Sequence, residues 1–256
     1  MIESYDILSK RVNLLRDGFE GRYKYIIRAL LNKQFKAVAG RVTADNMRSD
    51  LTNIIDEDPL AKLFDDLYTK VGVTFARDSY GNKKAISETE LIDRWEQYMK
   101  DYARRKAGDR IVSITEMTRK QIRDIIGSVI ETATADGLGA EETARLIRKE
   151  LVKQGQEINR WRSLRIARTE VGTASSAGSL SGIRALGMPF DKVWIAAGPA
   201  RSGKERQEHQ ALHKTAIGGD ELFNVGGGME GPHDPAGGAD QVINCRCTLT
   251  YRIRRT

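Results

Sequence analysis

The sequence predicts an α+β fold, in which a mainly helical N-terminal region precedes a C-terminal domain of helices packed on a small β-sheet. Three observations support this class. Glycine, which destabilises helix interiors, occurs five times in the first 100 of the 256 residues and fourteen times after residue 165. Apolar residues in the first part recur every three or four positions, which is the period of an amphipathic helix. After Gly187 and Pro189 the period becomes two, which is the period of a strand.

The N-terminal region is expected to contain two main helices. Apolar residues repeat at helical spacing from Leu8 to Leu30. Asp58-Pro59 is expected to break this run, and residues 78–82 have the composition of a loop. A second helix is expected to begin near Ser87, where a serine and early acidic residues favour a start, and Gly108 is expected to stop it.

Further helices are expected before the sheet. Residues 114–153 have the pattern of a helical hairpin with its turn at Gly137-Leu138-Gly139. Another long helix is expected over residues 157–186. Its segment Gly172–Ser179 consists almost entirely of small residues, which allow the backbone of a neighbouring element to approach closely. We place the boundary between the helical region and the second domain after residue 107, giving domains 1–107 and 108–256.

The sheet is expected to be small. Residues 192–196 alternate as a strand, residues 204–214 suit a short helix, and a glycine-rich loop follows over residues 218–238. The clearest pattern is the last one. From residue 245 to 254, apolar and polar side chains alternate strictly, which predicts a strand with one apolar and one polar face.

Composition excludes several classes of protein. A hydrophobic content of 40% with 30% charged residues is typical of a globular chain. No apolar run approaches 18 residues, so no membrane-spanning helix is expected, and the N-terminus lacks the order of a signal peptide. Two cysteines cannot form a disulfide scaffold. The net charge of +7 is spread over both predicted domains, so there is no dedicated basic arm.

The histidines and cysteines are concentrated near the end of the chain and suggest a metal site. Thiolate and imidazole groups are the usual ligands of structural Zn²⁺. Cys245 and Cys247, at alternate strand positions, point the same way, and His209 and His213, four apart, share a helix face. His233 is an alternative ligand. The sequence therefore predicts a structural zinc site. The alternative is that the cysteines are plain core residues and the histidines are solvated.

Catalytic interpretations of the same residues are disfavoured. His209-Gln210-Ala211-Leu212-His213 is similar to a metalloprotease helix, but glutamine replaces the glutamate that would act as general base. A thiol protease could be assembled from His209, Asn244 and Cys245, but Cys245 opens a buried alternation, whereas catalytic cysteines commonly lie at a helix N-terminus. The glycine-rich loop contains no phosphate-binding motif. We therefore expect no enzyme.

Charged residues suggest two further roles. In Arg168-Thr169-Glu170 the opposite charges are two apart on a helix and do not face each other, so Glu170 is expected to form a structural ion pair with Arg206. Four basic residues near the chain end are candidate contacts to nucleic-acid phosphates, unless they only aid solubility: Arg246, Arg252, Arg254 and Arg255.

Several motifs occur together in a fixed order. They are Ala167-Arg168-Thr169-Glu170, the small-residue helix to Gly187, Val193-Trp194, Arg206-x-x-His209-x-x-Leu212 and Asn244-Cys245-Arg246-Cys247-Thr248. This set resembles the phage Mu F-like family of minor head, or head-morphogenesis, proteins, and the resemblance covers residues 110–252. The chain departs from the family at His213, where members commonly have glycine.

The resemblance implies a structural protein of a tailed phage or prophage. Such a protein is recruited in few copies to the procapsid near the portal and assists head assembly or DNA packaging and ejection. The implied partners are the portal protein, scaffold or major capsid protein and packaged double-stranded DNA, without a membrane. The implied location is the virion, inside the head or at the portal vertex, and the host cytoplasm during assembly. The alternatives are a toxin-type enzyme or effector, with residues 1–107 as cargo on a phage-head domain, and a DNA-binding module.

Overall fold

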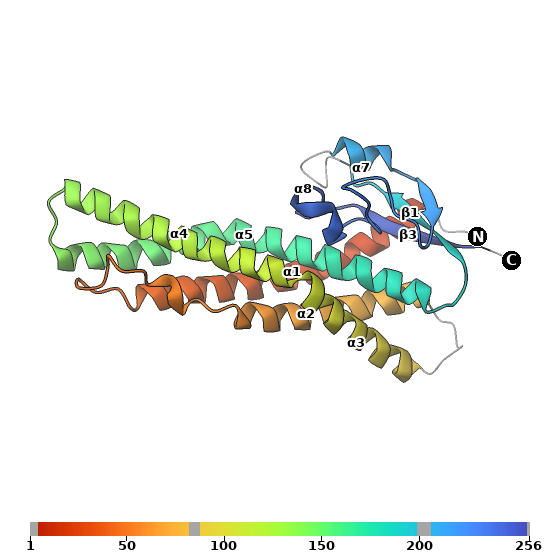
Figure 1. The fold of residues 1–256 in the computed structure, drawn as a ribbon, viewed down its shortest axis with the longest axis horizontal. Coiled ribbons are helices and arrows are strands. Elements are labelled where there is room, and N and C mark those ends of the chain that lie inside the picture. The colour runs from red at the N-terminus through yellow and green to blue at the C-terminus, as the bar shows by residue number, and fades with distance from the viewer. Residues whose placement is uncertain (1–4, 82–87, 199–205, 255–256) are drawn as a thin grey trace. The chain divides into compact units, whose positions relative to one another are not determined.

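The computed structural model describes residues 5–81, 88–198 and 206–254 (Figure 1). The helices are α1 (Tyr5–Ala39), α2 (Asp58–Tyr80), α3 (Glu88–Lys106), α4 (Gly108–Ala135), α5 (Ala140–Arg184), α7 (Gln207–Ala211) and α8 (Gly238–Val242), with short 3-10 turns η1 (Thr52–Ile54) and η2 (Pro235–Gly237). The strands are β1 (Phe190–Ile195), β2 (Ala216–Gly218) and β3 (Thr248–Ile253). Helices dominate and the sheet lies in the C-terminal part, so the predicted α+β class is confirmed.

The chain forms two compact units, each assembled from separate stretches of sequence. Unit 1 contains Met1–Tyr23, Phe64–Lys106 and Arg165–Thr256, and unit 2 contains Lys24–Leu63 and Ala107–Leu164. One junction between the units lies at Lys106–Ala107, one residue before the boundary that we place after residue 107. Each unit nevertheless combines residues from both sides of that boundary.

Proline and glycine act differently from the expectation at two helix starts. Asp58-Pro59 begins α2 instead of ending a helix, because proline in a first turn loses no hydrogen bond and has a suitable φ. Gly108 does not stop α3, which ends at Lys106; it is the first residue of α4. The predicted turn at residues 137–139 is confirmed, and Gly137 there has a left-handed φ of 69°. Ser87 lies outside the described residues.

The two helices expected over residues 140–153 and 157–186 are one continuous helix. α5 runs for 45 residues without interruption, although Gly155 lies in its first half. A Cβ atom on Gly155 would lie 2.6 Å from Cδ1 of Phe35 on α1, within unit 2. Glycine is therefore present there to admit the phenylalanine ring, and the packing more than offsets its lower helix propensity.

The small residues in the second half of α5 bring it close to α2 in unit 1, as predicted. A Cβ atom on Gly178 would overlap the carbonyl oxygen of Gly72, and one on Gly182 would overlap that of Ala76. Backbone therefore packs directly against backbone along this contact.

Unit 2 has a conventional apolar core from α1, α4 and α5. Buried residues that form it include Phe35, Val38, Ile122, Ile125, Ile147 and Leu151. These isoleucines and leucine are members of the stripes that predict the hairpin.

The sheet of unit 1 is antiparallel, in the order β2-β1-β3. The β1–β3 register runs from Phe190 opposite Ile253 to Ile195 opposite Thr248. β3 begins later than expected, because a left-handed residue, Asn244, precedes a turn, so Cys245 and Cys247 lie before the strand. The predicted polar face of β3 is not solvated throughout, since its threonines at 248 and 250 are buried. Every helix in the described part of the chain is too short or too polar to span a bilayer.

Candidate metal centre

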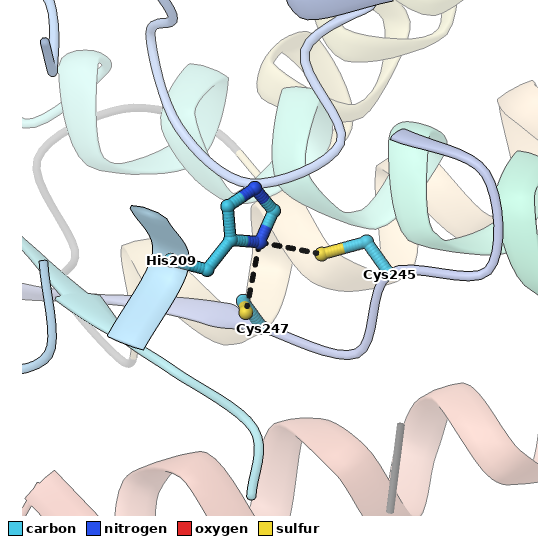
Figure 2. A group of neighbouring side chains, drawn as sticks. All are labelled: His209, Cys245 and Cys247. Atoms are coloured by element: carbon cyan, nitrogen blue, oxygen red, sulfur yellow. Dashed lines mark hydrogen bonds between the residues drawn. The ribbon is translucent and has the colours of Figure 1, made fainter. Parts of the chain in front are cut away.

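His209, Cys245 and Cys247 form a buried group in unit 1 (Figure 2). The Nδ1 atom of His209 lies 3.6 Å from Sγ of Cys245 and 3.5 Å from Sγ of Cys247. Figure 2 shows both sulfurs directed at this one ring nitrogen. The three candidate ligand atoms all lie within 4.8 Å of one another. The structure therefore brings together three of the residues that predict the zinc site.

Two short elements and a turn position these side chains. His209 lies on α7, and the cysteines lie in the turn between α8 and β3 (Figure 1). Asn244 shapes the turn through its φ of 58°, and its backbone N–H donates to Oγ1 of Thr169 on α5 at 3.1 Å. The N–H of Cys245 donates to the carbonyl oxygen of Val242 at 3.1 Å, which turns the chain back from α8.

The surroundings of the group are mainly apolar. The indole of Trp194 on β1 meets the His209 ring edge-on, with ring centroids 5.0 Å apart. Phe223 packs edge-on against the same indole at 5.1 Å. The N–H of Ala197 donates to Sγ of Cys247 at 3.4 Å, so one sulfur also accepts a backbone hydrogen bond. These contacts exclude water and fix the orientations of the three side chains.

The pKa values of the two thiols are shifted in opposite directions. A hydrogen bond from Cys247 is the main cause that lowers the pKa of Cys245 well below its ordinary value. The same hydrogen bond, together with burial, raises the pKa of Cys247. The lowered pKa of Cys245 favours its thiolate form, and the hydrogen bond from Cys247 is the main cause. Thiolate is the form of cysteine that binds a metal ion.

The separations suit a single tetrahedral ion. With Zn–S of about 2.3 Å and Zn–N of about 2.0–2.1 Å, a sulfur and a nitrogen ligand lie about 3.6 Å apart. The observed separations from His209 are 3.5 and 3.6 Å. Two sulfurs and one imidazole nitrogen are also a donor set that zinc prefers. The residues fit the ion, and three of them leave one of its four positions to another group.

The other two histidines lie apart from the group. His213 is exposed, and its Nδ1 accepts a hydrogen bond from the N–H of Ala196 at 3.2 Å. The shared helix face expected for His209 and His213 does not form, because α7 ends at Ala211. His233 is fully buried, and its Nε2 lies 3.5 Å from Nη1 of Arg16. Burial lowers the pKa of His233 to about 3, so the ring is neutral at pH 7.

Arg246, between the two cysteines, is buried and not available to DNA, which corrects the expectation for this residue. Its guanidinium forms an ion pair with Glu20 and donates to Oδ1 of Asp17 at 3.1 Å, both on α1. Nε of Arg168 on α5 lies 3.5 Å from the same Glu20 carboxylate. A guanidinium is buried here because a carboxylate is buried with it, as buried charges require.

Arg16 is a second buried arginine, and no sequence motif points to it. It donates to Oγ of Ser175 at 2.6 Å, to Oγ of Ser176 at 3.0 Å and to the carbonyl oxygen of Cys247 at 2.7 Å. Burial lowers its pKa to about 10. Arg16 and Glu20 continue the helical spacing of Val12 on the buried face of α1. Charged residues on that face were the signal that could have identified them.

The remaining charged candidates are engaged in other ways. Arg252 donates to Oδ2 of Asp191 at 2.6 Å, and Arg254 donates to Oδ1 of the same residue at 2.6 Å. These hydrogen bonds lower the pKa of Asp191. Both arginines keep about half of their side chains exposed. Arg255 lies outside the described residues.

The ion pair expected between Glu170 and Arg206 is corrected. Glu170 accepts a hydrogen bond from the hydroxyl of Tyr68 on α2 at 2.7 Å. Arg206 donates to the carbonyl oxygens of Asp240 and Ile243 at 2.7 Å each. The arginine precedes α7 and faces the C-terminal end of α8, where helix carbonyls lack intrahelical partners. This contact ties α7 to the cysteine turn.

Together, the fold and the site define a helix-rich α+β protein with a buried cysteine–histidine group beside a small antiparallel sheet. Residues 124–250 match a family model described as Phage Mu protein F like protein. Over this range the chain is similar to the phage Mu F-like family, which confirms the expected resemblance. The match supports a phage head-morphogenesis protein in general. The matched range includes His209, Cys245 and Cys247.

Two curated relatives are similar to the chain over part of their length. The protein named NAD(+)--arginine ADP-ribosyltransferase EFV, from Enterococcus faecalis (strain ATCC 700802 / V583), is 31% identical over 146 residues, which are 56% of this chain and 28% of that protein. The uncharacterized protein YqbB of Bacillus subtilis (strain 168) is 25% identical over 163 residues, which are 62% of this chain and 49% of that protein. The chain thus spans about half of one relative and less than a third of the other. No solved structure matches the chain significantly.

Proposed function

We propose that this protein is a minor component of a tailed-phage head, recruited in few copies to the procapsid near the portal. There it assists head assembly or the packaging and ejection of DNA. The observation that carries the proposal is the family match over residues 124–250, which contains the cysteine–histidine group. In this role the protein needs no catalytic residue. Its place is inside the head or at the portal vertex, after assembly in the host cytoplasm.

The partners in this proposal are the portal protein, the scaffold or the major capsid protein. α1 carries apolar side chains suited to such contacts, since Leu14 is 74% exposed and Ile7 is also exposed. Exposed apolar side chains that form a continuous patch are typical of surfaces that another protein covers. Packaged double-stranded DNA is a further proposed partner.

The test is incorporation into heads. The full chain, with an epitope tag, is produced together with the head genes of the phage that encodes it, and procapsids are isolated on a gradient. Mass spectrometry should find a few copies per procapsid, and omission of the portal protein should reduce that number. Absence from procapsids, or a copy number equal to that of the major capsid protein, would contradict the proposal.

We also propose that His209, Cys245 and Cys247 hold a structural zinc ion. Two distances near 3.6 Å, the lowered pKa of Cys245 and an apolar, buried setting support it. The ion would neutralise the buried sulfur charge and fix α7 against the cysteine turn. It would cross-link α7 to the cysteine turn and would take part in no reaction.

A toxin-type enzyme is the second candidate, because one relative is named as an NAD(+)--arginine ADP-ribosyltransferase. The shared segment covers 28% of that relative, so most of that protein has no counterpart in this chain. Incubation of the full chain with labelled NAD⁺ and an arginine-rich acceptor protein distinguishes the candidates. We expect no labelled acceptor; transfer of label would favour the enzyme.

A further inference from the structure

Unit 2 carries a surface hollow that the proposed function does not use. It has a volume of about 450 Å³ and lies between α1 and α5. The residues lining it include Lys24, Tyr25 and Arg28 from α1 and Arg160 and Trp161 from α5. The hollow is distinct from the cysteine–histidine group, which belongs to unit 1.

The hollow is strongly basic. Lys24, Arg28 and Arg160 contribute three positive charges, and no carboxylate is among the described residues that line it. Some other basic side chains on the surface are paired with carboxylates, as in the contacts of Arg145 with Glu142 and of Lys120 with Asp124. A concave surface that gathers charge of one sign concentrates ligands of the opposite sign.

Two large rings lie exposed beside these charges. Trp161 is 69% exposed and Tyr25 is 63% exposed. Cζ of Arg160 lies 5.5 Å from the centroid of the Trp161 ring, and Nζ of Lys24 lies 4.7 Å from that of Tyr25. Each ring thus has a cation near one face, and more than half of its side chain is open to solvent.

We propose that this hollow binds single-stranded nucleic acid. Each helix offers a cation next to a ring, and a single strand offers a phosphate next to an unpaired base. Unpaired bases stack on aromatic side chains, whereas a duplex keeps its base faces covered. The occupant is therefore a strand whose phosphates meet Lys24, Arg28 and Arg160 while its bases stack on Tyr25 and Trp161. This binding does not depend on the proposed place of the protein in a phage head.

The experiment uses the full chain and a ten-residue deoxythymidine oligonucleotide. Trp161 is the one exposed tryptophan of three, since Trp95 and Trp194 are buried, so quenching of tryptophan fluorescence reports on this hollow. Anisotropy of a labelled oligonucleotide gives the affinity at several salt concentrations. When the logarithm of the binding constant is plotted against the logarithm of the salt concentration, each phosphate contact on a single strand contributes a slope of roughly −0.7. Three contacts therefore predict a slope of about −2.

Variants separate the ring from the charges. Trp161→Ala should weaken binding about tenfold, whereas Trp161→Phe should restore most of it, because stacking needs a ring. Arg28→Ala and Arg160→Ala should each reduce the magnitude of the slope by about 0.7. Arg104→Ala removes the same charge from an exposed position on α3. It should change neither the affinity for the oligonucleotide nor the slope of its salt dependence. Circular dichroism verifies that each variant is folded.

Three outcomes would overturn the proposal. One is an affinity for the oligonucleotide that is the same as that of the native chain in each of the three variants Trp161→Ala, Arg28→Ala and Arg160→Ala. Another is equal competition by a duplex of the same length, which would leave the rings without a role. The third is preference for poly-glutamate over the oligonucleotide, which would assign the hollow to an acidic protein segment.

Discussion

The ring nitrogen of His209 that faces both sulfurs gives a direct test of the zinc proposal. Protein purified without a histidine tag should contain close to one zinc ion per chain by elemental analysis. His209→Ala and Cys247→Ser should each lose most of it, because two ligands hold zinc far less tightly than three. His213→Ala, which changes an exposed histidine outside the group, should retain the ion.

Metal removal completes this test. A chelator should lower the melting temperature of the native chain and leave that of Cys247→Ser unchanged. Less than about 0.2 zinc per chain, with unchanged melting in chelator, would leave Cys245 and Cys247 as ordinary core residues.

Gly172 on α5 makes room for the buried His233. A Cβ atom at this position would overlap the imidazole ring. Gly172→Ala should therefore lower the free energy of unfolding by about 1–3 kcal/mol, measured by urea denaturation. Gly127→Ala is the matched control, because that glycine is also helical and has open space around it. The control should be neutral or stabilising by up to about 1 kcal/mol, and equal effects in both variants would refute the overlap.

Among the elements, α1 is joined to the cysteine turn by buried charge. Glu20→Gln would remove the buried carboxylate that pairs with Arg246 and lies near Arg168, and would leave Arg246 only the more exposed Asp17. We expect a loss of about 3 kcal/mol or more in the free energy of unfolding, because an unpaired buried charge is costly. Asp17→Asn removes a more exposed carboxylate from the same arginine and should cost under about 1 kcal/mol. Similar losses in the two variants would mean that Glu20 is not the main partner.

The pairing of β1 with β3 is supported by Asp191 and two arginines. Hydrogen bonds from Arg252 and Arg254 lower the pKa of Asp191 below its ordinary value of 3.8. A carboxyl group whose pKa is lowered in the folded state stabilises that state at pH values above its ordinary pKa. This stabilisation is lost as the pH falls through the lowered pKa. The free energy of unfolding should therefore fall more steeply from pH 5 to pH 2 in the native chain than in Asp191→Asn. Parallel pH profiles would show that this carboxylate does not contribute.

At the scale of the whole molecule, local patterns predict most of the fold. The turn at Gly137 and the strand alternation near the chain end depend on neighbouring residues, and the sequence shows them. The continuity of α5 through Gly155 depends on Phe35, which a local pattern cannot include. The start of α2 at Asp58-Pro59 could have been predicted, since proline fits the first turn of a helix although it breaks a helix interior.

The candidate site was predictable by residue type and less so by geometry. His209, Cys245 and Cys247 could be named because thiols and imidazoles are rare in this chain. The exclusion of His213 depends on the length of α7, which no motif encodes. The burial of Arg246 depends on Glu20, whose position is 226 residues earlier. Long-range pairing of this kind cannot be read from one sequence alone.

The interleaved units lead to a prediction about fragments. Unit 1 needs Met1–Tyr23 and Phe64–Lys106 as well as Arg165–Thr256. A fragment of residues 108–256, the predicted second domain, lacks the partners of Arg246 and the α2 backbone that faces α5. We expect this fragment to be digested by trypsin at a concentration at which the full chain resists. A protease-resistant fragment with a cooperative melting transition would show that the predicted domain folds alone.

The contacts between α1 and the cysteine turn also have a consequence for biosynthesis. Arg16 contacts Cys247 and Glu20 pairs with Arg246, across 231 and 226 residues of chain. A ribosome that adds about 5–20 residues per second needs roughly 10–45 s to cover that distance. All of unit 2 has been synthesised once Leu164 is added. At that point the partners of Arg16 and Glu20 on α1 have not yet been synthesised. The nascent chain therefore completes its two units in sequence, and release of the last residues from the ribosome allows the charges of α1 to be buried.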